Sequence, residues 1–177
     1  MKRVAFFTLG CKVNQYDTEA MLELFKKAGY EVVDFDQIAD VYIVNTCTVT
    51  NLGDRKSRQA IRRAHRLNPD AVIAVAGCYA QRAPQELLAI PGVRLVLGTK
   101  NRSKIVELVE KVHHENIQLD AVENIMITRE FEDLAIEAQE GHTRAFLKIQ
   151  EGCNQFCSYC IIPYARGPIR SRKRKDI

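Results

Sequence analysis

The chain has 177 residues, enough for one ordinary domain with a buried core and a further segment. Its 46% hydrophobic and 27% charged residues are typical of a soluble globular protein, and its longest apolar runs are too short to cross a bilayer. The N-terminal stretch MKRVAFFTLGCKVNQ lacks the cleavage signature of a signal peptide, so we expect a cytoplasmic protein without membrane association. The net charge of +4 is modest and says less than its distribution.

Apolar runs that resemble buried strands alternate with segments of helical periodicity. The predicted strands are 4–7, 31–35, 41–44, 71–76 and 94–97. Such alternation indicates a parallel sheet covered on both faces and joined by right-handed crossovers. The connection DQIAD is too short to join adjacent parallel strands, so the second and third strands are not neighbours or a short helical turn intervenes. The flavodoxin-like order 2-1-3-4-5 separates these two strands, and we predict this α/β fold.

Four segments have the apolar spacing of helices that pack on a sheet. The first is predicted to start at an Asp17 N-cap and to end at Gly29, a residue suited to the position after a helix. The second spans 52–67, a short third starts near Pro84, and the last spans 101–113. The expected inner faces contain Ala20, Met21, Leu24, Phe25 and Ala28, then Ala60, Ile61, Ala64 and Leu67, and finally Ile105, Leu108, Val109 and Val112.

The charge changes sign between two consecutive segments near the C-terminus. Residues 120–140 contain seven acids and one base, whereas residues 141–177 contain eight Lys or Arg and two acids. Such a shift in composition marks a linker or a domain boundary. We therefore divide the chain into a domain at 1–118, a linker at 119–143 and a further segment at 144–177.

The first thiol set consists of Cys11, Cys47 and Cys78, each of which follows a predicted strand. In a reducing cytosol, six cysteines favour metal ligation or catalysis over disulfides. The carboxyl ends of neighbouring strands meet at the ligand-binding edge of an open α/β sheet, so these thiols are expected to converge. Three thiolates leave one position open on a zinc ion or on one iron of a four-iron cluster, which indicates a reactive centre. The alternative is that each is a small buried core residue.

The second thiol set, Cys153, Cys157 and Cys160, has the spacing CxxxCxxC after a predicted strand in AFLKIQEG. It supplies three ligands instead of the four of a ferredoxin motif. A zinc knuckle or chance spacing is the alternative, but no fourth cysteine or suitably spaced histidine completes a zinc site. The histidines are assigned to the surface or the core: His65, His113, His114 and His142.

The segments TLGCKVNQYDTE, VNTCTVT, AVAGCYAQ and KIQEGCNQFCSYCIIPYARGPIRSR together resemble the radical S-adenosylmethionine methylthiotransferases, over essentially the whole chain. The residues KVNQ at 12–15 are most similar to the branch that acts on N6-threonylcarbamoyladenosine at position 37 of tRNA. The resemblance implies a cluster-binding methylthiotransferase domain at 1–118 and the beginning of a radical S-adenosylmethionine partial β/α barrel at 144–177. It also implies that the chain is an N-terminal fragment, which alone would not catalyse the reaction.

By this resemblance, the first thiol set would bind an auxiliary [4Fe-4S] cluster that carries sulfur at its open iron. The second set would bind the [4Fe-4S] cluster that reduces S-adenosylmethionine. One S-adenosylmethionine would methylate the sulfur, and another would yield the radical that removes hydrogen from C2 of the adenine. Tyr159 would lie near the adenine of S-adenosylmethionine, or its ring would simply pack in the barrel wall. The electron donor and the sulfur donor are not identified by the sequence.

The segment 52–67 carries six cations and one acid. Arg55, Arg58, Arg62 and Arg66 recur at helical spacing opposite the apolar stripe. One interpretation is a solvated surface, and the other is a phosphate-binding surface for the anticodon loop of a tRNA. The C-terminal run RSRKRK could likewise contact RNA or belong to a larger domain.

Two alternatives to this function stay open. Within the same enzyme class, the substrate could be isopentenyladenosine at position 37 of tRNA or an aspartate of a ribosomal protein. Outside it, the chain could be a zinc-binding or redox-sensing module without catalysis.

Overall fold

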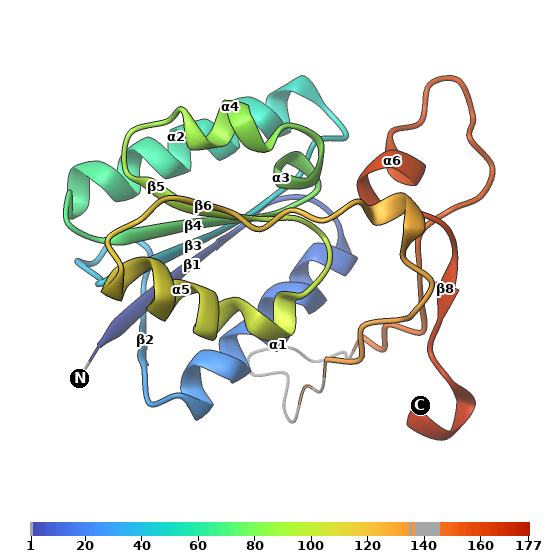
Figure 1. Ribbon diagram of the computed structural model, residues 1–177, viewed down its shortest axis with the longest axis horizontal. Coiled ribbons are helices and arrows are strands. Elements are labelled where there is room, and N and C mark those ends of the chain that lie inside the picture. Colours follow the sequence, from blue (N-terminus) through green and yellow to red (C-terminus); the bar gives the residue numbers. More distant parts are fainter. Residues whose placement is uncertain (1, 135, 137–145) are drawn as a thin grey trace.

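A parallel sheet lies at the centre of the computed structural model, which describes residues 2–134, 136 and 146–177. Its strands are β1 (Arg3–Thr8), β2 (Glu31–Val33), β3 (Val41–Thr46), β4 (Val72–Gly77), β5 (Val93–Leu97) and β6 (Leu119–Asp120). Their order is β2-β1-β3-β4-β5-β6, and all neighbours are parallel (Figure 1). The predicted flavodoxin-like α/β arrangement is confirmed, because β1 separates β2 from β3.

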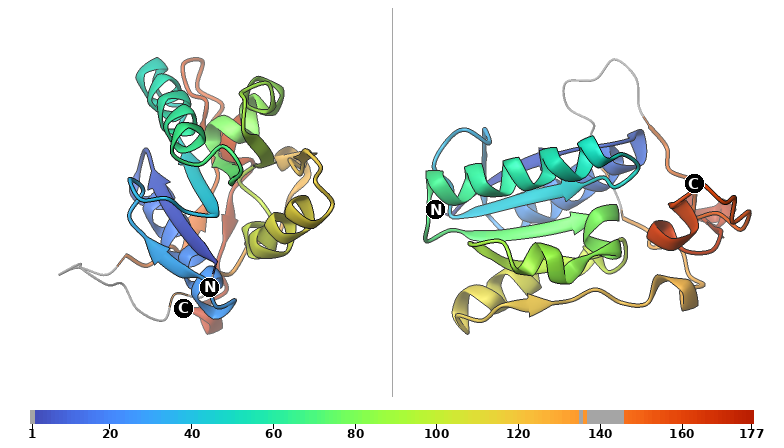
Figure 2. Two further views of the ribbon diagram at one scale, coloured as in Figure 1. Left: turned by 90° about the vertical axis from the view of Figure 1, so that its left-hand side faces the viewer. Right: turned by 90° about the horizontal axis from the view of Figure 1, so that it is seen from above.

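Helices cover both faces of this sheet (Figure 1, Figure 2). They are α1 (Lys12–Lys27), α2 (Asn51–Leu67), α3 (Cys78–Arg82), α4 (Pro84–Leu88) and α5 (Ile105–His114), whereas α6 (Ile162–Arg166) lies beyond the end of the sheet. Apolar residues of α2 and α4 form the core on one face, and those of α1 and α5 form the core on the other. Strands β3 and β4 lie between these cores, so every residue in them is buried.

Three of the predicted helices lie close to their expected positions. The Thr50 hydroxyl accepts a hydrogen bond from the Gly53 N–H at 3.1 Å and caps α2. Of its predicted inner residues, Ala60, Ile61 and Ala64 are buried and Leu67 is partly buried. A 3-10 helix at Arg102–Lys104 precedes α5, and the short helix α4 starts at Pro84. Gly29 follows α1 with a φ of +82°, the conformation expected of a glycine after a helix.

The predicted start of the first helix is wrong. The helix α1 begins at Lys12 with Cys11 in the N-cap position, and Asp17 lies inside it with an exposed fraction of 2%. A buried carboxylate in a helix needs cationic partners, and Asp17 receives them from distant segments. Asp17 therefore stabilises tertiary contacts between distant segments, and rules for helix caps, which consider only neighbouring residues, do not detect this role.

The predicted linker at 119–143 begins with β6, which pairs with β5 at Leu95 and Leu119. Two residues are too few to show the periodicity of a strand. Residues 135 and 137–143 of this linker, including His142, lie outside the described part of the chain. The domain division therefore stays a prediction.

The segment 146–177 lies at the end of the sheet to which its strands point (Figure 1). It contains α6 and two short strands, β7 (Gln150–Glu151) and β8 (Arg170–Ser171), which pair antiparallel. Whether this segment begins a β/α barrel stays a prediction. Among the described residues, no helix combines the length and apolar character needed to cross a bilayer.

The short connection between β2 and β3 is held by Tyr42, a fully buried residue of β3. Its hydroxyl donates to the Gln37 carbonyl at 2.7 Å and accepts from the Ala39 N–H at 3.1 Å. We expect Tyr42→Phe to lower the free energy of unfolding by about 1–3 kcal/mol, because a buried N–H loses its acceptor. Urea unfolding measures this change. The control Tyr164→Phe, at a side chain 57% exposed, should change it by less than about 0.5 kcal/mol, and equal effects would contradict the assignment.

Candidate metal centre

The first thiol set lies at the carboxyl edge of the sheet, as its place in the sequence predicts. Thr46 of β3 pairs with Gly77 of β4, so Cys47 and Cys78 each directly follow paired residues of neighbouring strands. On the other side of β3, the Leu9 N–H donates to the Asn45 carbonyl at 2.9 Å. This bond ties the turn that contains Cys11 to the same edge.

The side chain of Cys47 lies against Gly10, the residue before Cys11. A Cβ atom on Gly10 would stand 2.8 Å from the Cys47 Cβ and 3.0 Å from its Sγ, closer than side chains normally approach. Gly10 also has a φ of +106°, a conformation that favours glycine. The sequence therefore leaves space for the Cys47 sulfur beside Cys11.

The three thiols of this set differ in exposure. Cys11 is exposed, Cys47 is partly buried and Cys78 is buried. Burial raises the pKa of Cys78, the nearby thiols of Cys47 and Cys11 add to this, and the Arg166 guanidinium opposes it. The contact of Cys47 with Gly10 and the pairing of Thr46 with Gly77 place the three thiols at one edge of the sheet.

Among the described residues, no three His, Cys, Asp or Glu side chains are placed to hold a single metal ion. All six cysteines are within this part of the chain, and all are free thiols. A four-iron cluster binds each thiolate at a different iron, so its ligands stand farther apart than those of one zinc ion. Three thiols at one open edge are donors of the type that both zinc ions and iron–sulfur clusters accept.

Arg166 connects the first thiol set to the C-terminal segment. Its Nε donates a hydrogen bond to the Cys78 Sγ at 3.3 Å. Its Nη2 also donates to the Asn14 side chain, whose amide donates to the Leu9 carbonyl at 2.7 Å and the Thr46 carbonyl at 2.9 Å. This cation is therefore fixed beside a thiol by the same groups that order the sheet edge.

The second thiol set lies in the loop between β7 and α6. The Cys153 N–H donates to the Gly167 carbonyl at 3.0 Å, and the Cys160 N–H donates to the Cys157 carbonyl at 2.9 Å. The tip of the loop is open, since Cys157 is exposed. Tyr159 is 91% exposed in this loop, and both of its predicted roles stay predictions.

A buried group of charges, which we call the ion cluster, holds this loop against the sheet edge. It consists of Asp17 from α1, Arg102 from the 3-10 helix after β5, and Lys148, Glu151 and Arg166 from the C-terminal segment. Each member is at most 7% exposed. Each of its three cations pairs with both of its carboxylates, and Glu132 adds a third carboxylate beside Arg102 at 3.1 Å.

The distances in the ion cluster are those of charge-assisted hydrogen bonds. The Asp17 carboxylate accepts hydrogen bonds from Lys148 at 2.7 Å and from Arg166 at 2.9 Å, and it also pairs with Arg102. The Glu151 carboxylate accepts hydrogen bonds from Arg166 at 2.5 Å and from Arg102 at 3.1 Å. Burial raises the pKa of Asp17, but Arg102, Arg166 and Lys148 overcome this and hold that pKa below its usual value.

Sequence reasoning did not identify Asn14 or any member of the ion cluster as part of the site. Asn14 and Asp17 lie in the motif GCKVNQYDTE, which carries the family resemblance. Membership of this motif was the sequence feature that could have identified them. Of the described histidines, His65 packs against Gly92, and His113 and His114 are exposed. These positions agree with the assignment of histidines to the surface or the core.

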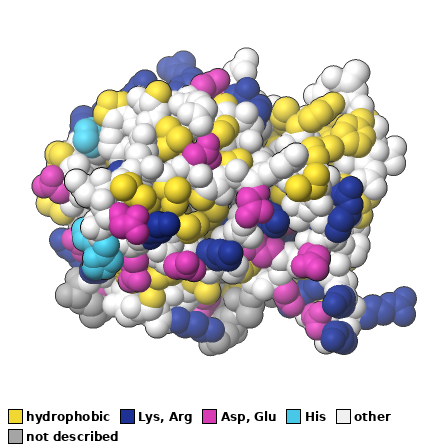
Figure 3. All heavy atoms as spheres, viewed as in Figure 1, with side chains coloured by type: hydrophobic (Ala, Val, Ile, Leu, Met, Phe, Trp, Pro, Cys, Tyr) yellow, Lys and Arg dark blue, Asp and Glu magenta, His cyan; other side chains and the backbone are white. Residues whose placement is uncertain are grey.

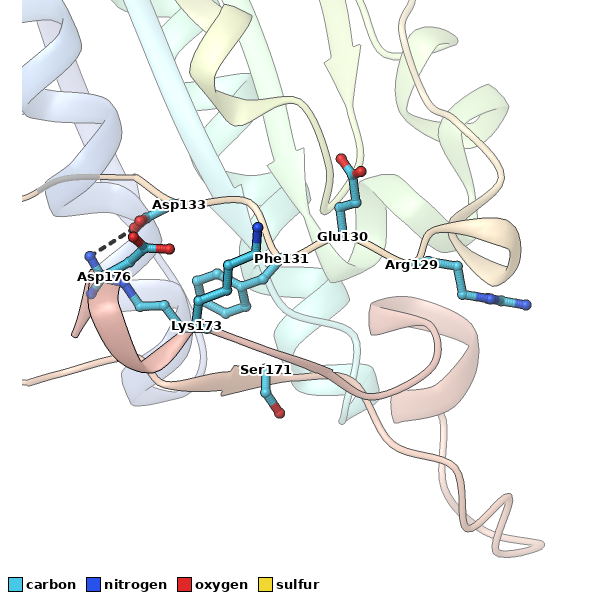
Figure 4. Close-up of a pocket in the computed structure, with 8 residues that line it drawn as sticks. Arg129, Glu130, Phe131, Asp133, Ser171, Lys173 and Asp176 are labelled. Atoms are coloured by element: carbon cyan, nitrogen blue, oxygen red, sulfur yellow. Dashed lines mark ion pairs between the residues drawn. The ribbon is translucent and has the colours of Figure 1, made fainter.

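A pocket of about 450 Å³ lies between residues 129–133 and the chain around β8 (Figure 4). Asp133 and Arg172 form an ion pair across it at 2.8 Å. The lining residues are Arg129, Glu130, Phe131, Asp133, Ser171, Arg172, Lys173 and Asp176. No cysteine lines this pocket, and charges of both signs do, so it is separate from the candidate centre.

Comparison with known proteins identifies the family. Residues 3–98 match the model described as uncharacterized protein family UPF0004. The chain belongs to this family. The UPF0004 match spans β1 to β5 and includes the first thiol set. Together with the relatives described next, this match confirms the resemblance to methylthiotransferases at the level of the family.

Curated relatives of this UPF0004 protein carry methylthiotransferase names. It is 58% identical over 177 residues to the threonylcarbamoyladenosine tRNA methylthiotransferase MtaB of Bacillus subtilis and 47% identical over 169 residues to that of Aquifex aeolicus. It is 38% identical over 185 aligned residues to the tRNA-2-methylthio-N(6)-dimethylallyladenosine synthase of Moorella thermoacetica. These matches cover 100%, 96% and 99% of the chain, but only 39%, 41% and 40% of the relatives.

Replacing Asp17 by Asn should destabilise the protein strongly. At neutral pH the change leaves buried cations without a counter-charge, and we expect a loss of about 3–5 kcal/mol in the free energy of unfolding. The control Asp133→Asn breaks an ion pair whose carboxylate is 43% exposed and should cost less than about 1 kcal/mol. Urea unfolding followed by circular dichroism measures both, and similar losses would contradict the role of the ion cluster.

The two Asp17 forms should also differ in their response to acid. The pKa of Asp17 is lowered in the folded state, so its stabilisation is fully present above the unfolded value of about 3.9 and is lost as pH falls through the folded value. The free energy of unfolding of the native chain should therefore fall more steeply below about pH 4 than that of Asp17→Asn. Parallel curves would show that another group governs acid unfolding.

Proposed function

We propose that the chain holds the cluster-binding residues of an enzyme that adds a methylthio group to C2 of N6-threonylcarbamoyladenosine at position 37, in the anticodon loop of tRNA. The observation that carries the proposal is the hydrogen bond from Arg166 to Cys78. It joins the sheet edge that bears the first thiol set to the segment that bears the second. Two thiol sets held at one edge fit a reaction that uses two clusters on one base.

The choice of substrate is supported by the relatives. Identity is 58% and 47% to two proteins named for threonylcarbamoyladenosine, and 38% to one named for dimethylallyladenosine. The dimethylallyladenosine substrate is therefore the second candidate. A reducing cytoplasm suits six free thiols, and we propose that location.

In this proposal, the first thiol set holds the auxiliary cluster and the second holds the cluster that binds S-adenosylmethionine. When bound, the clusters and S-adenosylmethionine supply the sulfur, the methyl group and the radical. Arg166 places a positive charge beside Cys78, which favours the thiolate form that ligation requires. The ion cluster fixes the loop of the second set relative to the edge of the sheet. Tyr159, exposed in that loop, is available to contact the adenine of S-adenosylmethionine.

Anaerobic reconstitution with iron and sulfide tests the two metal centres. The chain should take up two clusters, about eight iron and eight sulfide ions. Replacing the first thiol set by alanine should remove about half of the iron and spare the spectrum of the second centre, and the matched triple variant of the second set should do the reverse. One equivalent of zinc with no iron would contradict the proposal and support the zinc module.

The substrate is tested separately with the full-length protein. Cells that lack the native enzyme should regain 2-methylthio-N6-threonylcarbamoyladenosine in their tRNA when the protein is expressed. Mass spectrometry of digested tRNA measures the product. A gain of methylthio groups on dimethylallyladenosine instead would favour the second candidate, and a modified ribosomal protein would contradict both.

A further inference from the structure

A groove of about 560 Å³ runs between α2 and the edge of the sheet formed by β1 and β2. We call it the α2 groove, and the residues that matter here are Phe7, Leu9, Phe35, Lys56, Arg63 and Arg66. It is separate from both thiol sets and from the pocket in Figure 4. Its floor is apolar, and its wall on α2 is cationic.

The strand order explains why this groove stays open. Helix α2 packs over β3 and β4, where Ile61 and Ala64 are fully buried against the sheet. The strands β1 and β2 lie beyond it at the edge of the sheet (Figure 2). Phe7 of β1 and Phe35 after β2 are therefore only partly buried, with ring centroids 5.0 Å apart. Their rings form an accessible aromatic floor.

The wall of the α2 groove carries positive charge in a regular row. Lys56, Arg63 and Arg66 recur at helical spacing on the side of α2 that faces the groove. Ten steps along the helix separate Lys56 from Arg66, and at a rise of 1.5 Å per residue the row is about 15 Å long, enough to follow more than one phosphate. Within the described part of the chain, the side chains of Lys56 and Arg66 have no hydrogen-bond or ion-pair partner, and that of Arg63 pairs with Asp36. Figure 3 shows Lys and Arg side chains gathered along the upper edge of the molecule, over α2.

The α2 groove lies near the first thiol set along the chain. Leu9 lines the groove and is followed directly by Gly10 and Cys11. The first turn of α2 also reaches this edge, since a Cβ on Gly53 would stand 3.1 Å from the Cys47 carbonyl oxygen. An extended ligand chain bound in the groove would therefore continue toward the candidate metal centre.

We propose that the α2 groove binds a single-stranded RNA segment that continues from the nucleotide at the thiol edge. The phosphates lie along the cations of α2, and a base stacks on the phenylalanine floor. Single-stranded nucleic acid is bound by this combination, because cations follow the backbone while aromatic faces accept any base. A duplex cannot place its paired bases on the floor. The inference deepens the proposed function and depends on it for the identity of the RNA as tRNA.

The test compares two charge reversals on one helix. Lys56→Glu with Arg66→Glu removes the unpaired cations of the groove, whereas the control, Arg55→Glu with Arg62→Glu, makes the same change in net charge at exposed residues outside it. Binding of the chain to a labelled RNA hairpin with a single-stranded loop is measured by fluorescence anisotropy at several salt concentrations. The groove variant should lose about tenfold or more in affinity, and its salt slope should fall by about 1.4, roughly 0.7 for each lost phosphate contact. The control should lose clearly less.

A second variant tests the aromatic floor. Phe35→Leu keeps an apolar side chain but removes the ring, and it should weaken binding to the hairpin about fivefold or more while leaving weak binding to a paired duplex unchanged. Equal loss in the groove and control variants, no loss in either, or equal loss for hairpin and duplex would overturn the inference. A shift of the oligomeric state in place of RNA binding would also overturn it, in favour of a second copy of the chain as occupant.

The iron content of each variant separates this inference from the proposed function. Normal cluster uptake with unchanged RNA binding in the groove variant overturns the inference alone. Loss of RNA binding in the groove variant of a chain that never takes up iron supports the groove and contradicts the proposed function.

Discussion

The ion cluster is the interaction on which the arrangement of the molecule depends. Asp17 and Glu151 are buried carboxylates that share the same cations, and these cations come from the 3-10 helix after β5 and from the C-terminal segment. A buried charge that loses its partners is strongly unfavourable, so the C-terminal segment cannot leave the sheet edge without a large cost in free energy. The relative position of the two thiol sets follows from this constraint, since Arg166 belongs to the ion cluster and also contacts Cys78.

Local sequence patterns predicted most of the fold, because the elements that carry it are long and regular. Strand order followed from one connection that was too short for adjacent parallel strands, and α2 and α5 followed from their apolar spacing. The helix α3 and the strand β6 were missed, since five and two residues are too few to show a period. Asp17 was misread as a cap because its partners lie far away in the sequence.

The candidate site was predictable where topology determines position and not where side chains pair across segments. The place of Cys47 and Cys78 at one edge followed from the rule that ligand sites lie at the carboxyl ends of parallel strands. The contact between Arg166 and Cys78 had no local signal, although Arg166 stands in a motif that resembles the family. The α2 groove depends on the incomplete cover of the sheet beside α2, which the charge pattern of the helix alone does not reveal.

Asp17 and Arg166 are in contact but are separated by 149 positions in the sequence. Asp17 is therefore synthesised long before this partner. Domains fold as units with N-terminal parts first, so the strands of the sheet leave the ribosome well before Lys148 does. Until then Arg102 is the only cation of the ion cluster available to Asp17, and water must hydrate the remaining edge. Docking of residues 146–177 thus follows formation of the sheet, and Cys78, which Arg166 contacts, is more accessible before that docking.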